Sequence, residues 1–140
     1  MRKYILLLFL SLYACTPHHD QKHIRIHHNH PTSISIITHV TLTCYQPVAS
    51  QCDSDPLTTS DGSKINLSHL KSNKIKWCAI SQDLLFLFHT RKNKRIYIEG
   101  YGVYDVKDVM NSNKHHHVDI LQHPSNSTMI LKKGVKIKIL

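Results

Sequence analysis

GYGVYDVKDVM (residues 100–110) and VDIL (residues 118–121) decide the fold, because each sets an aspartate in apolar, strand-like sequence. These aspartates are Asp108 and Asp119. A third, Asp83, follows similar sequence in WCAISQDLL (residues 77–85). Carboxylates rarely lie this close to a small core unless they are paired, hydrogen-bonded or functional. We therefore take the three aspartates as candidate site residues.

Strand patterns recur at short intervals from residue 38 onward. Apolar and polar residues alternate in residues 40–44, 96–98 and 135–139. Glycine and asparagine predict turns between strands, including one at Lys133-Gly134. Ser81 is placed to cap a short helix that would contain Asp83. The pattern predicts a mostly β domain of about six short strands, closed into a barrel, with one or two short helices.

The order of four segments, DPLTTSDG (residues 55–62) and the three above, resembles the 3D domain. This family is named for three aspartates and occurs in certain lytic transglycosylases and related cell-wall proteins. Asp83 follows an Ala-x-Ser strand end, Asp108 closes a strand that continues from a Gly-rich turn, and Asp119 lies in a Val-Asp pair. The resemblance covers residues 38–140 and implies a six-stranded double-psi β-barrel. Ordered matches are more specific than any single aspartate.

The resemblance also implies roles for the site residues. Asp119 is expected to be the general acid and base, with Asp108 orienting or tuning it. Asp83 is expected to support the site, and a purely structural role at a helix N-terminus is equally open. The candidate substrate contacts are Tyr45, Thr58, Thr59, Asp61, Gly62 and Lys114.

The expected reaction is cleavage of peptidoglycan glycan strands without water. One carboxyl protonates the leaving oxygen and then, as carboxylate, takes a proton from the sugar's own C6 hydroxyl, which closes a 1,6-anhydro ring. Such an acid must hold its proton near neutral pH, which burial or a second carboxylate promotes. The chain departs from the family's enzymes at residues 109–117, where a Gly-Gly-Ala-Ile-Lys-Gly segment is replaced. A non-catalytic protein that binds peptidoglycan or a wall-synthesis partner is therefore the alternative.

The N-terminal residues predict export and membrane anchoring. Residues 1–14 have a basic start, an apolar run and a small-residue end, as in a signal peptide. Leu12-Tyr13-Ala14-Cys15 resembles a lipobox, so Cys15 is the expected lipid anchor, and Thr16 favours the outer membrane facing the periplasm. Residues 15–37 form a His-rich stretch expected to be a tether. Metal capture by these histidines is a third hypothesis, but no spacing defines a metal site.

Composition limits the remaining possibilities. The formal charge of +9 suits anionic polymers and lipid headgroups, while no nucleic-acid-binding motif is present. If Cys15 carries lipid, three cysteines remain, and Cys44 with Cys78 is the expected disulfide; three free buried cysteines are the alternative. No nucleotide, flavin or haem motif occurs, so we expect no cofactor. The protein is expected to be a monomer.

Overall fold

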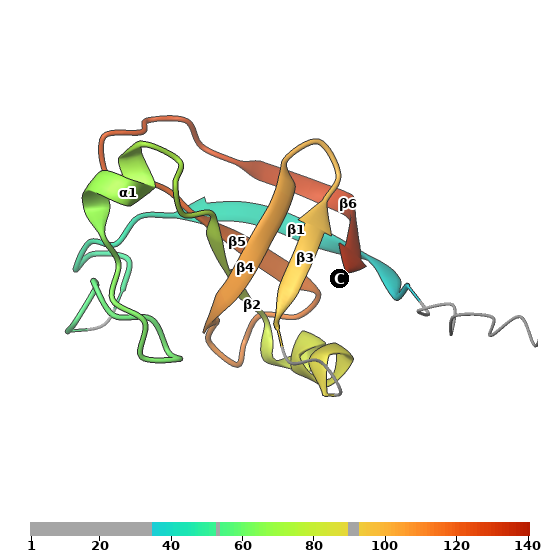
Figure 1. Ribbon diagram of the computed structural model, residues 1–140. Coiled ribbons are helices and arrows are strands. Elements are labelled where there is room, and N and C mark those ends of the chain that lie inside the picture. The colour runs from blue at the N-terminus through green and yellow to red at the C-terminus, as the bar shows by residue number, and fades with distance from the viewer. Residues whose placement is uncertain (1–34, 53, 90–92) are drawn as a thin grey trace, which may run out of the picture. The chain divides into compact units, whose positions relative to one another are not determined.

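The computed structural model describes residues 35–52, 54–89 and 93–140, so the predicted signal peptide, Cys15 and nearly all of the predicted tether lie outside the described residues. The described residues form a closed β-barrel with two short helices (Figure 1). The strands are β1 (Ile37–Tyr45), β2 (Trp77–Ile80), β3 (Arg95–Ile98), β4 (Gly102–Val109), β5 (His117–Leu121) and β6 (Leu131–Ile139). The helices are α1 (Leu67–Lys71) and the 3-10 helix η1 (Gln82–Phe88). Among these residues, no helix is long and apolar enough to cross a membrane.

The strands close the barrel in the order β1-β5-β2-β4-β3-β6. β1 pairs with β5 and β2 pairs with β4 in parallel, whereas the other four pairings are antiparallel. This arrangement confirms the predicted mostly β fold with a six-stranded barrel, and it is compatible with a double-psi barrel. Parallel pairing brings together strands that are distant in sequence, which is how the aspartate segments become neighbours.

Side-chain alternation places the core inside the barrel and the aspartates on its outer face. On β5, Val118 and Ile120 are buried, while His117 and Asp119 are only half-buried. Successive strand residues point to opposite faces, so the two polar side chains share the outer face. The interior is filled mainly by branched aliphatic residues: Val40, Leu42, Ile80, Ile96, Ile98, Val118, Ile120, Ile137 and Ile139.

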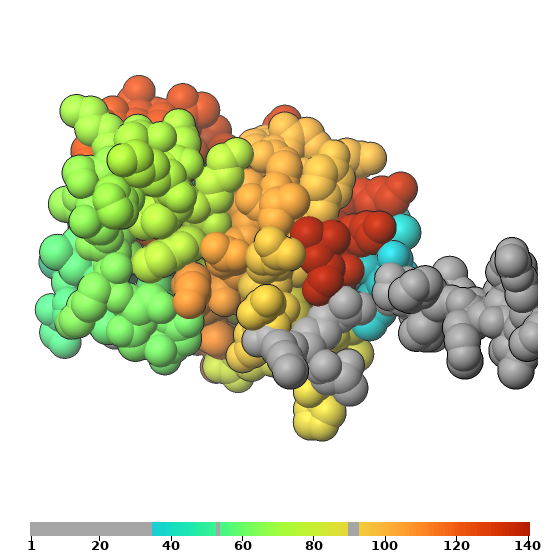
Figure 2. Space-filling view, viewed as in Figure 1, coloured from blue at the N-terminus to red at the C-terminus, as the bar shows by residue number. Residues whose placement is uncertain are grey.

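Residues 46–52 and 54–76, from the connection between β1 and β2, lie together on one side of the molecule (Figure 2). They contribute to a second apolar cluster on the outer face, in which Ile65 and Leu70 pack with Leu121 of β5. α1 belongs to this segment, and Asn66 caps it by accepting a hydrogen bond from the backbone N–H of His69 at 3.0 Å. The outer face of β5 is thereby covered near Leu121, next to Asp119.

The prediction of a turn at Lys133-Gly134 is wrong, because both residues lie within β6. The pairing of β1 with β6 shifts register between Val40 and Leu42, opposite this point. Gly134 has a φ of +67°, a conformation that residues with a Cβ rarely adopt. The glycine therefore marks a bulge that bends a continuous strand rather than a turn that ends one.

Candidate active-site cleft

Asp108 and Asp119 lie on opposite sides of Ala79 in the barrel sheet. Ala79 of β2 pairs with Asp119 of β5 on one side and with Asp108 of β4 on the other. Two strand spacings separate the backbones of the two aspartates by roughly 9–10 Å. Because the side chain between them is only a methyl group, the space above Ala79 remains open.

These three residues line a cleft of about 670 Å³. Residues from the β1–β2 connection form one wall, and the start of the β4–β5 connection forms another. The cleft is lined by Tyr45, Gln51, Cys52, Asp55, Pro56, Thr58, Thr59, Ser60, Ile65, Ala79, Asp108, Val109, Met110, Asn111, Lys114 and Asp119. Its volume lies in the range of small-molecule binding sites. The structure thus brings six sequence-predicted residues together: Tyr45, Thr58, Thr59, Asp108, Lys114 and Asp119.

Asp119 has a pKa above its ordinary value. Burial raises this pKa most, and the nearby Asp108 carboxylate also raises it. A hydrogen bond from Thr43 and the charges of His117 and Lys114 act in the opposite direction, without cancelling the effect of burial. A raised pKa is what a carboxyl needs to serve as a general acid at a pH well above 4.

The Thr43 hydroxyl on β1 connects Asp119 to His117, and both of these residues lie on β5. Thr43 Oγ1 donates to Asp119 Oδ1 at 2.7 Å and lies 2.9 Å from His117 Nε2. With its one proton committed to Asp119, the hydroxyl accepts from the imidazole, which requires the tautomer protonated at Nε2. Burial lowers the pKa of His117, although the charge of Asp119 acts to raise it. The chain from His117 through Thr43 fixes the orientation of the Asp119 carboxyl.

Asp108 is held by three donors. Its Oδ1 accepts from the backbone N–H groups of Ser60 at 3.0 Å and Val109 at 2.9 Å, and its Oδ2 accepts from Tyr45 Oη at 3.2 Å. Burial raises the pKa of Tyr45, and the charge of Asp108 raises it further, so the phenol keeps its proton and donates. Asp108 therefore joins β4 to both β1 and the 55–64 loop, and it forms part of the cleft wall.

The loop at residues 55–64 is tied together by its own side chains. Thr58 Oγ1 donates to Asp55 at 2.6 Å, and Thr59 Oγ1 donates to Asp61 at 2.8 Å. Although burial acts to raise the pKa of Asp61, hydrogen bonds from Ser63 and Thr59 lower it to about 2. Gly62 has a φ of +83°, which suits the tight turn behind Thr59. Asp61 and Gly62 support the loop from behind and do not line the cleft.

Asp83 lies outside the cleft, in the first turn of η1. Its carboxylate accepts from the His116 backbone N–H at 3.0 Å and lies 2.9 Å from His116 Nδ1. Burial acts to raise the pKa of Asp83, but hydrogen bonds from Ser81 and His116 lower it. His116 has a φ of +46°, so these contacts hold an unusual backbone conformation just before β5. Ser81 precedes η1 as expected, yet its hydroxyl accepts from the His117 backbone N–H instead of capping the helix.

The expected disulfide between Cys44 and Cys78 is not present. Both residues pair with Ile120, from β1 on one side of β5 and from β2 on the other. Two strand spacings separate their Cα atoms by roughly 9–10 Å, beyond the span of about 7 Å that a disulfide allows. The prediction failed because apolar strand sequence does not reveal that β5 inserts between β1 and β2.

The sequence prediction missed Thr43 and His117, which form a hydrogen-bonded chain to Asp119. The sequence spacing could have indicated both residues, because Thr43 is two residues from Tyr45 and His117 is two residues from Asp119. Period-two alternation puts each pair on one face. In the described ranges, no group of three or more histidine, cysteine, aspartate or glutamate side chains is arranged to hold a metal ion.

No protein family, curated protein or solved structure matches this chain.

Proposed function

We propose that this chain is an envelope lipoprotein of the 3D type, with a double-psi β-barrel, that binds peptidoglycan and cleaves its glycan strands. The observation that carries the proposal is Asp119, a carboxyl of raised pKa that lines an open cleft across Ala79 from a second carboxylate. A cleft of about 670 Å³ has room for sugar units.

In the proposed reaction, protonated Asp119 gives its proton to the glycosidic oxygen as the bond from that oxygen to C1 breaks. The resulting carboxylate then accepts the proton of the C6 hydroxyl as O6 bonds to C1. The bond made replaces the bond broken, Asp119 regains its proton, and no water is consumed. Thr43 orients the carboxyl in both states, while Lys114 lies at the cleft, where its charge favours the carboxylate formed between the two steps.

The decisive experiment incubates the purified full-length chain with peptidoglycan and identifies the soluble fragments by mass spectrometry. We expect 1,6-anhydro fragments from the wild type and none from Asp119→Asn, whose amide oxygen still accepts from Thr43. Glu99→Gln makes the same chemical change at an exposed position outside the cleft and should leave the products unchanged. Full activity of Asp119→Asn would disprove the assignment.

A binding protein without catalytic activity is the second candidate. Met110 and Asn111 line the cleft in the segment where the enzymes of the resembling family carry glycines. In the same experiment, this candidate predicts that the protein is retained on insoluble peptidoglycan and releases no fragments. Absence of both retention and release would contradict both candidates.

Membrane anchoring through Cys15 belongs to the same proposal. The motif Leu12-Tyr13-Ala14-Cys15 supports it. Cys15→Ser should move the protein from the membrane fraction to the soluble fraction and remove the mass of the lipid. An unchanged distribution would rule out Cys15 as the anchor.

A further inference from the structure

A second pocket, of about 620 Å³, opens at one end of the barrel and is separate from the Asp119 cleft. It is formed where β5 ends, where β6 begins and where β4 begins, with α1 at its edge. We call it the barrel-mouth pocket. Its lining includes Lys76, Tyr101, Tyr104, Gln122, Asn126 and Lys132.

The lining is cationic and includes no carboxylate. Lys71, Lys76 and Lys132 line the pocket together with His123, while no aspartate or glutamate does. The ion pairs of the described residues involve other side chains, so these three ammonium groups are not neutralised by a carboxylate there. Uncompensated positive charge in a concave site concentrates the field and attracts anions.

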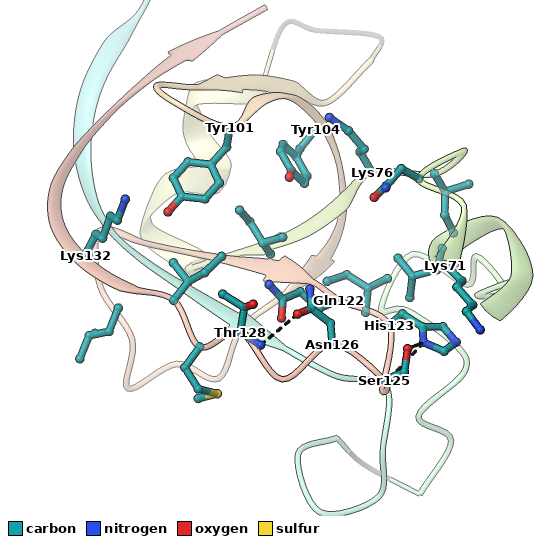
Figure 3. Close-up of a pocket in the computed structure, with 18 residues that line it drawn as sticks. Lys71, Lys76, Tyr101, Tyr104, Gln122, His123, Ser125, Asn126, Thr128 and Lys132 are labelled. Atoms are coloured by element: carbon teal, nitrogen blue, oxygen red, sulfur yellow. Dashed lines mark hydrogen bonds between the residues drawn. The ribbon is translucent and has the colours of Figure 1, made fainter.

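Two of the lysines are positioned by aromatic rings. Lys132 Nζ lies 5.2 Å from the centre of the Tyr101 ring, and Lys76 Nζ lies 5.7 Å from that of Tyr104. In Figure 3, the two tyrosines lie along one side of the pocket, with Lys132 near Tyr101 and Lys76 near Tyr104. A ring face holds an ammonium group without removing its charge. The lysines are thus restrained and still have donors for a ligand.

The opposite side is a pre-organised polar loop. Figure 3 shows Gln122, Asn126 and Thr128 facing the tyrosines. Asn126 Oδ1 accepts from the Thr128 backbone N–H at 2.9 Å, and the Asn126 carbonyl accepts from Gln46 Nε2 at 2.6 Å. The Cys44 sulfur accepts from the Ile130 backbone N–H at 3.2 Å. A loop fixed in this way loses little conformational entropy when a ligand binds.

We propose that the barrel-mouth pocket binds an anionic saccharide, one that carries a carboxylate or a phosphate group. The lysines supply charge for the anion, and the amides of Gln122 and Asn126 supply donors and acceptors for hydroxyls. The tyrosine rings, with exposed Met129 and Leu131, supply apolar surface for the C–H face of a sugar. This site does not depend on catalysis at Asp119.

The test is a ¹⁵N NMR titration of the full-length chain with two matched pairs of sugars. N-acetylmuramic acid is compared with N-acetylglucosamine, which lacks its carboxylate, and glucose 6-phosphate is compared with glucose. We expect the anionic member of one or both pairs to shift the amides of Tyr101, Tyr104 and Gln122 and to bind more tightly than its neutral partner. The responsive pair identifies carboxylate or phosphate as the recognised group.

Charge-matched variants locate the effect. Lys76→Gln combined with Lys132→Gln should weaken binding of the anionic sugar by about tenfold or more. Lys136→Gln combined with Lys138→Gln removes the same charge from exposed positions of β6 outside the pocket and should have little effect. Asp119→Asn should bind as the wild type does, so this result is separate from the test of cleavage. Equal binding of neutral and anionic sugars, equal weakening by both lysine pairs, or shifts confined to the Asp119 cleft would overturn the proposal.

Discussion

Thr43 and Asp119, which are 76 residues apart in the sequence, are direct partners across the parallel β1–β5 pair, and the Thr43 hydroxyl donates to the Asp119 carboxylate at 2.7 Å. This bond stabilises the ionised form, whereas burial stabilises the protonated form. The raised pKa of Asp119 is the outcome of that opposition. The proton affinity of the candidate acid is therefore adjustable at a residue outside the cleft lining.

Thr43→Val removes the hydroxyl while keeping the shape of the side chain. The pKa of Asp119 should rise further, because burial is then opposed by one donor fewer. Since the proposed reaction needs the protonated acid, activity should fall as pH rises through this pKa, and the variant should keep activity to a higher pH than the wild type. The measurement is the rate of anhydro-fragment release as a function of pH.

Thr43→Ser is the matched control, because it retains the hydroxyl and should retain the wild-type pH profile. Stability gives a second readout. A carboxyl whose folded pKa is raised favours the fold below its unfolded pKa of about 3.9, and this contribution is lost as pH rises through the folded pKa. Thr43→Val should therefore be more destabilised at neutral pH than in acid. A uniform loss at all pH values would show that the hydroxyl does not act through Asp119.

Tyr45→Phe should destabilise the fold by about 1 kcal/mol, since Asp108 loses one of its three donors and the ring remains in place. Chemical denaturation measures the change. Tyr97→Phe is the control, because Tyr97 lies on the exposed face of β3 and its hydroxyl makes no hydrogen bond to the described residues. Similar effects of the two substitutions would indicate that the bond to Asp108 contributes nothing to stability.

Asp83→Asn should lower the melting temperature at neutral pH without abolishing cleavage, because Asp83 restrains His116 and does not line the cleft. The pKa of Asp83 is lowered in the fold, so its stabilisation is present above the unfolded pKa of about 3.9 and is lost as pH falls through the folded value. The difference in melting temperature between wild type and variant should therefore shrink as pH falls through the folded pKa of Asp83. Loss of cleavage with an unchanged melting temperature would instead place Asp83 in the catalytic site.

The barrel could be predicted because buried and exposed residues alternate along its strands, which is a local pattern in the sequence. Alternation in residues such as Ile96 and Ile98, or Val118 and Ile120, reports which face is buried, and the core follows that pattern. α1 escaped prediction because its five residues are too few for helical periodicity, although Asn66 at its start was a usable capping signal. The bulge at Gly134 has the same local signature as a turn, and only the pairing with β1 distinguishes them.

Contacts within the site depend on topology, which local patterns do not encode. The resemblance to the 3D domain implied that Asp108, Asp119 and Tyr45 share one site, and all three line one cleft in the structure. The same reasoning grouped Asp83 with them, but η1 turns Asp83 toward His116. The cysteine pairing failed for the same reason, since it required knowing that β5 lies between β1 and β2.

Gly134→Ala tests whether the bulge in β6 is a requirement of the fold. A Cβ at this position would meet no atom within 4 Å, so any cost must come from the backbone, whose φ is +67°. An L-residue in this left-handed conformation is disfavoured by about 1 kcal/mol. We expect a loss of stability of that size for alanine and a smaller loss for Gly134→Asn, because asparagine tolerates this region better. Denaturation of the two variants measures the difference, and equal stability of alanine, asparagine and wild type would mean that the strand can straighten at no cost.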